Sequence, residues 1–186
     1  MPVNLHAVVT WSHPRVPFAY VQDASDGICV MNPQWDVRDT AKPGTIVAVE
    51  GLATEGEFVP AVTNAVLRRV GWWNLEPGHL VSLEQALTGL EDGRWVAMRG
   101  FVRQLTRTNG LARFDLGSSS GEFQVWALDS RTFDPLKGAI IRVQGVCAAL
   151  SNARQQLTGI QIWTPDLRYV RVEEAALSPS PWSGST

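Results

Sequence analysis

Hydrophobic and polar residues alternate in short runs along almost the whole chain, and turn-forming residues separate the runs. The runs are rich in β-branched and aromatic side chains, and His13-Pro14, Lys42-Pro43-Gly44 and Glu55-Gly56 are examples of the turns between them. Alternation with a period of two is typical of β-strands that bury one face. The pattern predicts strands over residues 8–11, 18–23, 27–31, 46–52 and 62–70, and again over 95–105, 111–116, 122–127, 140–150, 156–164 and 169–172.

The second half of the chain repeats the first. Three segments recur in the same order at a nearly constant spacing, as expected of a duplicated structural unit. Residues 5–9 match 98–102 and residues 19–23 match 112–116 at an offset of 93, and residues 46–51 match 140–145 at an offset of 94. Five short strands per unit are typical of a small Greek-key barrel of the oligomer-binding (OB) type. The sequence therefore predicts an all-β fold of two tandem OB-like barrels, over residues 1–72 and 94–174.

Residues 73–93 are predicted to form a linker with one short helix. Ser82 and Gln85 have the spacing of a capping box, and Gly89 suits the C-terminal cap. The apolar face of this helix should cover one end of a barrel or the seam between the two barrels. Neighbouring side chains on a strand point to opposite faces, so one of two adjacent tryptophans is predicted to lie between the barrels. The residues assigned to this interface are Trp72, Trp73, Leu83, Leu87 and Leu90.

The composition is that of a folded protein without an overall basic excess. Of the 186 residues 45% are hydrophobic, and the formal net charge is −2, whereas dedicated nucleic-acid binders usually carry a basic excess. Cys29 and Cys147 fall in different units, which predicts two free, buried thiols and no disulfide. No apolar run is long enough to span a membrane. Residues 175–186 have the composition of a flexible linker and strand-like sequence begins at the N-terminus, so we expect a piece of a longer protein.

Residues that could support catalysis or bind a metal do not form a recognised arrangement. His6, His13 and His79 have no partner at a metal-ligand spacing. Residues 117–121, Gly-Ser-Ser-Ser-Gly, lie between two predicted strands and are interpreted as a hairpin loop, whereas a nucleophile elbow would open a helix. Carboxylates such as Asp23 fall in turns. We therefore expect no enzymatic activity, no catalytic residue, no cofactor and no metal.

The chain holds eight tryptophans, and several arginines cluster in one predicted hairpin. Aromatic side chains on an OB face can stack bases or sugars, although packing within or between the barrels would also explain them. The arginines could form a basic face beside a tryptophan, or simply a solvated strand face. The polar turn 151–155 could hold an anion or a peptide backbone, or its asparagine could satisfy its own turn. The candidate binding residues are Trp126, Arg99, Arg103, Arg113, Asn152 and Arg154.

Several motifs form a set spread over residues 2 to 174. They are Pro2-Val3-x-Leu5-x-x-Val8-Val9-Thr10-Trp11, Phe18-x-x-Val21-Gln22-Asp23, Gly44-x-x-Val47-x-Val49-Glu50-Gly51, Val81-Ser82-Leu83, Trp95-Val96-x-x-x-Gly100-x-Val102 and Gly145-Val146-Cys147-x-x-x-x-Asn152-x-Arg154-x-Gln156-Leu157-x-Gly159. Together they resemble the N-terminal sensory region of certain large bacterial sensor histidine kinases. The resemblance implies an extracytoplasmic (periplasmic) tandem OB-like input region of a membrane-anchored receptor. It implies a soluble segment, with signal peptide, membrane helix and kinase core outside this chain, and it names no ligand.

Two functions from different classes remain. The first is a non-enzymatic binding or sensing module, the input region of a signal-transduction histidine kinase, with a small ligand or a protein as its partner and nucleic acid not favoured. The alternative is an OB-fold binder of single-stranded nucleic acid or oligosaccharide. A nucleic-acid binder should show a contiguous positive face with exposed aromatic side chains. A sensor should show a neutral pocket, often at the seam between the barrels.

Overall fold

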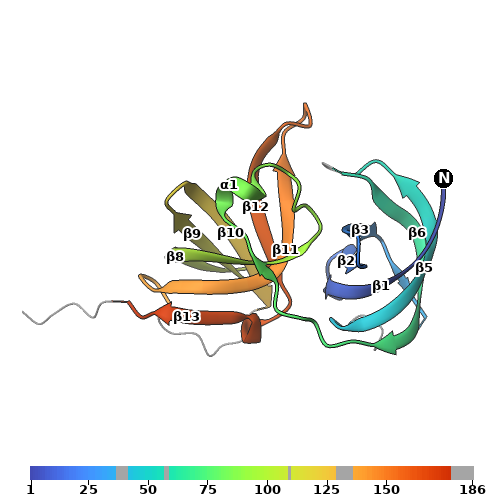
Figure 1. The fold of residues 1–186 in the computed structure, drawn as a ribbon, viewed down its shortest axis with the longest axis horizontal. Coiled ribbons are helices and arrows are strands. Elements are labelled where there is room, and N and C mark those ends of the chain that lie inside the picture. Colours follow the sequence, from blue (N-terminus) through green and yellow to red (C-terminus); the bar gives the residue numbers. More distant parts are fainter. Residues whose placement is uncertain (37–41, 57–58, 109, 129–135, 177–186) are drawn as a thin grey trace, which may run out of the picture.

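Two β-sheets, each curled into an OB-like barrel, lie side by side in the computed structural model of the chain (Figure 1). The structure describes residues 1–36, 42–56, 59–108, 110–128 and 136–176. The predicted C-terminal linker therefore lies mostly outside the described residues. The predicted all-β fold class is confirmed, and we keep the division at residues 72, 93 and 174 as a proposal.

Barrel 1 is a six-stranded sheet in the order β3-β2-β1-β5-β6-β4, and it closes through a parallel pairing of β3 with β6. β5 carries a register shift between Glu50 and Leu52, which is a β-bulge at Gly51. A side chain at Gly51 would lie 2.9 Å from the carbonyl oxygen of Thr63, and this close approach accounts for the glycine. The strands are β1 Pro2–Ser12, β2 Phe18–Gln22, β3 Gly27–Met31, β4 Gln34–Trp35, β5 Thr45–Thr54 and β6 Ala61–Trp72.

Barrel 2 is a seven-stranded sheet in the order β13-β11-β12-β10-β9-β8-β7, and it closes where β8 also pairs with β11. Residues 79–80 of the predicted linker contribute β7, which pairs with β8 in parallel. The chain enters β13 through a 3₁₀ turn at Leu167–Tyr169. The remaining elements are β7 His79–Leu80, α1 Leu83–Ala86, β8 Trp95–Thr108, β9 Leu111–Ser118, β10 Gly121–Leu128, β11 Ile140–Ser151, β12 Leu157–Thr164 and β13 Val170–Glu174.

The two barrels share one strand plan and one register. Leu5 of β1 pairs with Val49 of β5, and Met98 of β8 pairs with Val143 of β11, which are the residues that the sequence repeat aligns. β3 pairs with β6 in parallel in barrel 1, as β10 pairs with β12 in barrel 2. The strands β1, β2, β3, β5 and β6 therefore correspond to β8, β9, β10, β11 and β12.

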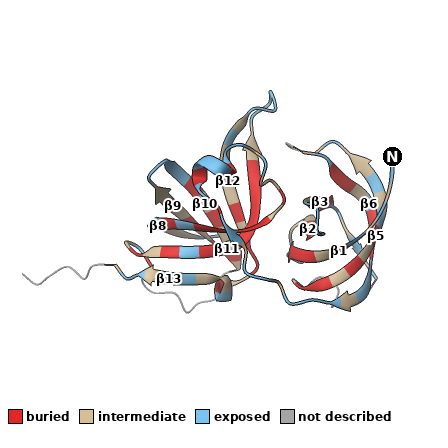
Figure 2. Ribbon diagram, in the orientation of Figure 1, coloured by how far each residue is buried: buried red, intermediate tan, exposed pale blue. Residues whose placement is uncertain are grey.

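Each barrel has its own apolar core, and buried positions alternate with less buried ones along several strands (Figure 2). Val9, Val21 and Leu67 are fully buried in barrel 1, and Phe114 and Ile162 are fully buried in barrel 2. Burying one such side chain contributes about 1.5–3 kcal/mol. Because each barrel has a core of its own, the contact between the barrels is an interface separate from both cores.

The predicted capping box of the linker helix is present. The hydroxyl of Ser82 accepts the backbone N–H of Gln85, and the Gln85 side chain accepts the backbone N–H of Ser82. Leu83 and Ala86 are buried in the core of barrel 2, so α1 covers one end of that barrel.

The residues predicted to join the barrels do not do so. Trp72 and Trp73 are 52% and 54% exposed, and the ring of Trp72 lies beside Gly44 at the end of barrel 1. Leu87 is 39% exposed because α1 ends at Ala86, and Leu90 is 75% exposed. A different set of side chains fills the seam: Trp11, Trp95 and Val146, with Val16, Phe18, Tyr20, Leu75, Trp163 and Tyr169 packed against them.

Candidate binding cleft between the barrels

A β-bulge directs Trp11 into the seam. Val9 pairs with Val21 and Trp11 pairs with Tyr20, so Thr10 is the extra residue of β1. Without the bulge Trp11 would point into the core like Val9, because alternate residues of a strand share a face. The Thr10 hydroxyl donates to the backbone oxygen of Tyr20 at 3.2 Å.

Trp11 joins an aromatic cluster that crosses the seam. Its ring stacks on Phe18 of its own barrel with a centroid distance of 5.3 Å, and it lies 4.9 Å from the ring of Trp163 in barrel 2. Phe18 meets both Tyr20 and Trp163 edge-on, at 5.8 and 5.3 Å. Aromatic pairs in such offset and edge-on geometries add about 0.5–1.5 kcal/mol beyond the burial of their area.

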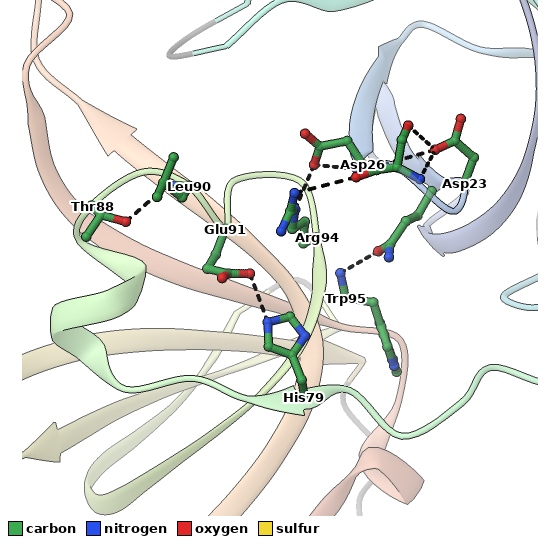
Figure 3. Close-up of polar contacts among 11 residues, drawn as sticks. Asp23, Asp26, His79, Thr88, Leu90, Glu91, Arg94 and Trp95 are labelled. Atoms are coloured by element: carbon green, nitrogen blue, oxygen red, sulfur yellow. Dashed lines mark hydrogen bonds and ion pairs between the residues drawn. The ribbon is translucent and has the colours of Figure 1, made fainter.

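Polar contacts also fasten the two barrels (Figure 3). The Gln22 side chain accepts the backbone N–H of Trp95 at 2.6 Å. Arg94 forms an ion pair with Asp26, with 2.9 Å between Nε and Oδ1. Gly27 and Gly93 meet so closely that a methyl group on Gly93 would lie 2.7 Å from the Gly27 carbonyl oxygen. The barrels are therefore docked against one another.

A cleft of about 590 Å³ opens between the docked barrels, and we call it the central cleft. Its volume is within the range of small-molecule sites, about 300–1,000 Å³. Most of its lining is apolar, the amides of Asn32 and Gln161 add neutral polar groups, and the carboxylates in its lining are Glu55 and Asp92. Barrel 1 contributes Phe18, Tyr20, Cys29 and Ala61 to the walls, and barrel 2 contributes Ala148, Ala149 and Trp163.

The central cleft continues into a hollow at each end. One hollow, of about 800 Å³, shares Pro17, Phe18 and Asn32 with the cleft and lies against the β1–β2 turn. The other, of about 550 Å³, shares residues 55, 56 and 59 with it and reaches Gln155 of the β11–β12 turn. We call the three together the groove. Loops at these strand positions flank the ligand face of OB folds.

One arginine lies in the turn at each end of the groove. Arg15 follows His13 and Pro14 in the β1–β2 turn, and Arg154 precedes Gln155 in the β11–β12 turn. Neither guanidinium forms an ion pair with a residue that the structure describes. Burial and the nearby Arg15 charge lower the pKa of His13, so its imidazole is neutral at pH 7.

The predicted basic face does not form. Arg99 binds Glu173 and Glu174 of β13, and its guanidinium lowers the pKa of Glu173. Arg103 pairs with Glu122 on β10. The partners come from strands distant in sequence, so alternation along β8 alone could not reveal them.

Arg113 and Trp126 do lie together, as the sequence predicted, but outside the central cleft. Arg113 is placed 5.9 Å above the Trp126 ring and also binds Asp115. Trp126 stacks on Trp163 with a centroid distance of 5.8 Å and an angle of 20°. Arg113 Nε and both indole N–H groups are buried without a hydrogen-bond partner among the described residues. Leaving such a donor unpaired costs about 1–3 kcal/mol.

Asn152 is a structural residue of its turn. Its Oδ1 accepts the backbone N–H groups of Arg154 and Gln156 at 2.9 and 3.1 Å, and its Nδ2 donates to the Gln156 side chain. Of the two alternatives weighed for this turn, the hairpin that satisfies itself is the one observed for Asn152. Arg154 keeps its guanidinium exposed.

Residues considered for catalysis occupy structural positions. Asp23 Oδ1 accepts the N–H groups of Ser25 and Asp26 in the β2–β3 turn, and Asp92 accepts the backbone N–H of Ala149. Residues 117–121 form the β9–β10 hairpin, as predicted. The described residues contain no cluster of metal-ligating side chains and no helix long and apolar enough to cross a membrane. Neither cysteine forms a disulfide, and Cys29 is only half-buried because it lines the cleft.

Comparison with solved structures finds distant matches over most of the chain. A murine DNA-binding protein bound to double-stranded DNA matches with 16% identity and a TM-score of 0.41, over 94% of this chain and 97% of that one. The Ifi202 HINa domain in complex with double-stranded DNA matches with 8% identity and a TM-score of 0.41, over 95% and 100%. The p202 HIN1 domain in complex with double-stranded DNA matches with 8% identity and a TM-score of 0.43, over 92% of each chain. Matches at this level carry no inference about the ligand of this chain.

The comparisons do not support the resemblance to sensor histidine kinases. No family model matches the chain, and no curated protein matches it. The matched structures described above are DNA-binding domains and not kinase input regions. The interpretation as the input region of a receptor, with the partners expected for it, is therefore wrong. The expected periplasmic location was based on the same resemblance and is no longer supported. Strand-and-glycine motifs recur wherever small barrels form, which explains why they misled.

Proposed function

We propose that the chain is a non-catalytic binding module that holds single-stranded nucleic acid in the groove between its two OB-like barrels. The observation that carries the proposal is the groove itself, in which the central cleft and two hollows adjoin through shared lining residues. A compact ligand would need the cleft alone. A run of three adjoining spaces suits an extended polymer whose units occupy them in turn.

Stacking supplies the affinity in this proposal. Phe18, Tyr20 and Trp163 present aromatic surface to the central cleft, and stacking one base on an aromatic side chain is worth about 1–3 kcal/mol. The amides of Asn32 and Gln161 can both donate to and accept from the edge of a base. Arg15 and Arg154 lie in the turns at the two ends, next to residues that line the hollows, and form no ion pair with a described residue, so we expect them to contact phosphates on either side.

The net charge of −2 limits the electrostatic share of binding. Each phosphate neutralised on a single strand contributes a slope of about −0.7 to the dependence of log K on log salt. Two contacting arginines therefore give a slope of about −1.4, shallow for a nucleic-acid binder.

An oligosaccharide is the second candidate, because Glu55 and Asp92 are the only charged side chains among the described residues that line the central cleft. Pyranose rings also stack on aromatic side chains and hydrogen-bond to amides and carboxylates. A neutral sugar releases no counterions, so its binding would show no salt slope.

The test is titration of the intact chain with short single-stranded DNA and RNA, the corresponding duplex, and neutral oligosaccharides, followed by tryptophan fluorescence at several salt concentrations. We expect single strands to bind best, with the shallow slope above. Arg15→Ala and Arg154→Ala should each reduce the slope by about 0.7, whereas Arg171→Ala, an exposed arginine on β13 outside the groove, should not. Binding of the sugar alone would favour the second candidate. Equal binding of duplex, or no binding at low salt, would contradict the proposal.

A further inference from the structure

The two barrels present equivalent rows of outward-facing residues that differ in size. In each row the residues are neighbours across adjacent strands, on the face opposite the core. The barrel-1 row is Trp11, Tyr20, Cys29 and Ala61, and the barrel-2 row is Thr106, Arg113, Trp126 and Trp163. Cys29 therefore occupies the position of Trp126, and Ala61 occupies the position of Trp163.

In barrel 2 the large side chains fill their own row. Trp126 stacks on Trp163, and the Arg113 guanidinium lies over Trp126. Neither Arg113 nor Trp126 lines the central cleft. The barrel-2 row is thus closed at Arg113 and Trp126 by its own side chains, while its Trp163 lines the central cleft.

In barrel 1 the small side chains leave the row open. Cys29 and Ala61 are far smaller than the indoles at the matching positions, and both line the central cleft beside Tyr20. Barrel 2 contributes the facing wall through Trp163 and the two alanines, Ala148 and Ala149. The two positions that hold indoles in barrel 2 therefore hold small side chains that border the cleft in barrel 1.

We infer that barrel 1 alone carries the ring-binding slot, that Cys29 and Ala61 form its floor, and that one base of the strand occupies it. This inference rests on the proposed function and adds the location of the site. The bound base would then take the place in barrel 1 that corresponds to the Trp126 ring in barrel 2. Large side chains at position 29 should compete with the ligand for the same space.

Cys29 provides a direct test in the unaltered protein. Burial raises the pKa of the Cys147 thiol to about 12, so at neutral pH an alkylating reagent such as iodoacetamide should modify Cys29 and spare Cys147. A bound single-stranded oligonucleotide should slow modification of Cys29 by about tenfold or more at saturation. Equal rates with and without a bound oligonucleotide would overturn the inference.

A matched pair of variants makes the second measurement. Cys29→Phe should weaken oligonucleotide binding by about tenfold or more, the equivalent of one lost stacked base, whereas Trp126→Phe in the closed row should leave it within about twofold. If Cys29→Phe does not fold, the alkylation rates still decide. A parent that binds no oligonucleotide contradicts the proposed function. A parent that binds while Cys29 stays reactive, or while Trp126→Phe is the weaker binder, contradicts only the placement in barrel 1.

Discussion

The side-chain oxygen of Gln22, at the end of β2, accepts the backbone N–H of Trp95, the first residue of β8, at 2.6 Å. This bond joins a strand of barrel 1 to the opening strand of barrel 2, and it is partly buried. A buried donor that loses its acceptor costs more than the bond contributes, because the group cannot return to water. The seam therefore depends on a single glutamine at this point.

Replacing Gln22 by alanine should loosen the docking of the barrels. The unpaired N–H of Trp95 should cost about 1–3 kcal/mol. Thermal unfolding should show a lower midpoint or two separated transitions, and protease should cut the segment between the barrels faster. Gln104→Ala is the control, since the side chain of this exposed glutamine forms, among the described residues, a single long hydrogen bond of 3.4 Å to Thr106. Equal unfolding of the two variants would show that the bond is not important for docking.

Trp11→Ala should be among the most destabilising single changes at the seam. Trp11 is 1% exposed and contacts rings of both barrels, and deleting a buried tryptophan costs about 3–5 kcal/mol. Trp73→Ala removes a side chain that is 54% exposed and should cost less than about 1 kcal/mol. Chemical denaturation of both variants gives the comparison. A larger loss for Trp73 would restore the interface that was first expected from the sequence.

Two variants in the β11–β12 turn should distinguish a residue that stabilises the fold from one that contacts the ligand. Asn152→Ala removes the acceptor of two backbone N–H groups and should lower stability by about 1 kcal/mol. Arg154→Ala should leave stability within about 0.5 kcal/mol while reducing the salt slope of oligonucleotide binding. Unfolding and binding measured on the same two variants check this. Loss of stability in Arg154→Ala without a change in slope would assign the arginine a structural role.

Alkaline pH should destabilise the fold through Cys147. Its pKa rises from 9.0 to about 12 because burial disfavours the thiolate, and the acidic Asp92 and Glu91 add to the effect. Between these values the unfolded chain has lost the thiol proton and the native chain keeps it, so stability falls as pH rises. The loss should reach about 4 kcal/mol by pH 12. Denaturant unfolding of Cys147→Ala should show a smaller decline over the same pH range, and parallel curves would contradict the assignment.

The sequence predicted the barrels well because strand periodicity and a repeat are local or near-local properties. The offsets of 93 and 94 pair Leu5 with Met98 and Val49 with Val143, and the structure pairs Leu5 with Val49 and Met98 with Val143. The capping box at Ser82 could also be predicted, since four consecutive residues contain it. These features need no knowledge of which strands meet.

The seam could not be predicted in the same way. Trp11 has the spacing of a core residue from Val9, and only the bulge at Thr10 turns it outward. Trp72 and Trp73 form a conspicuous pair, but β6 carries them to an exposed end of barrel 1. The cleft arises from small residues, Cys29 and Ala61, and a hydrophobic pattern does not distinguish a small side chain that fills a core from one that leaves a space.

The unequal rows of the two barrels bear on what each barrel would expose to solvent if it were alone. An isolated barrel 2 would display the indoles of Trp126 and Trp163 on its surface as an apolar patch, which favours self-association. In the intact chain Trp11 of the other barrel covers Trp163. Docking to barrel 1 therefore shields Trp163 from solvent. Barrel 1 produced alone would likewise expose Trp11 and Phe18, so either barrel alone should self-associate more readily than the intact chain.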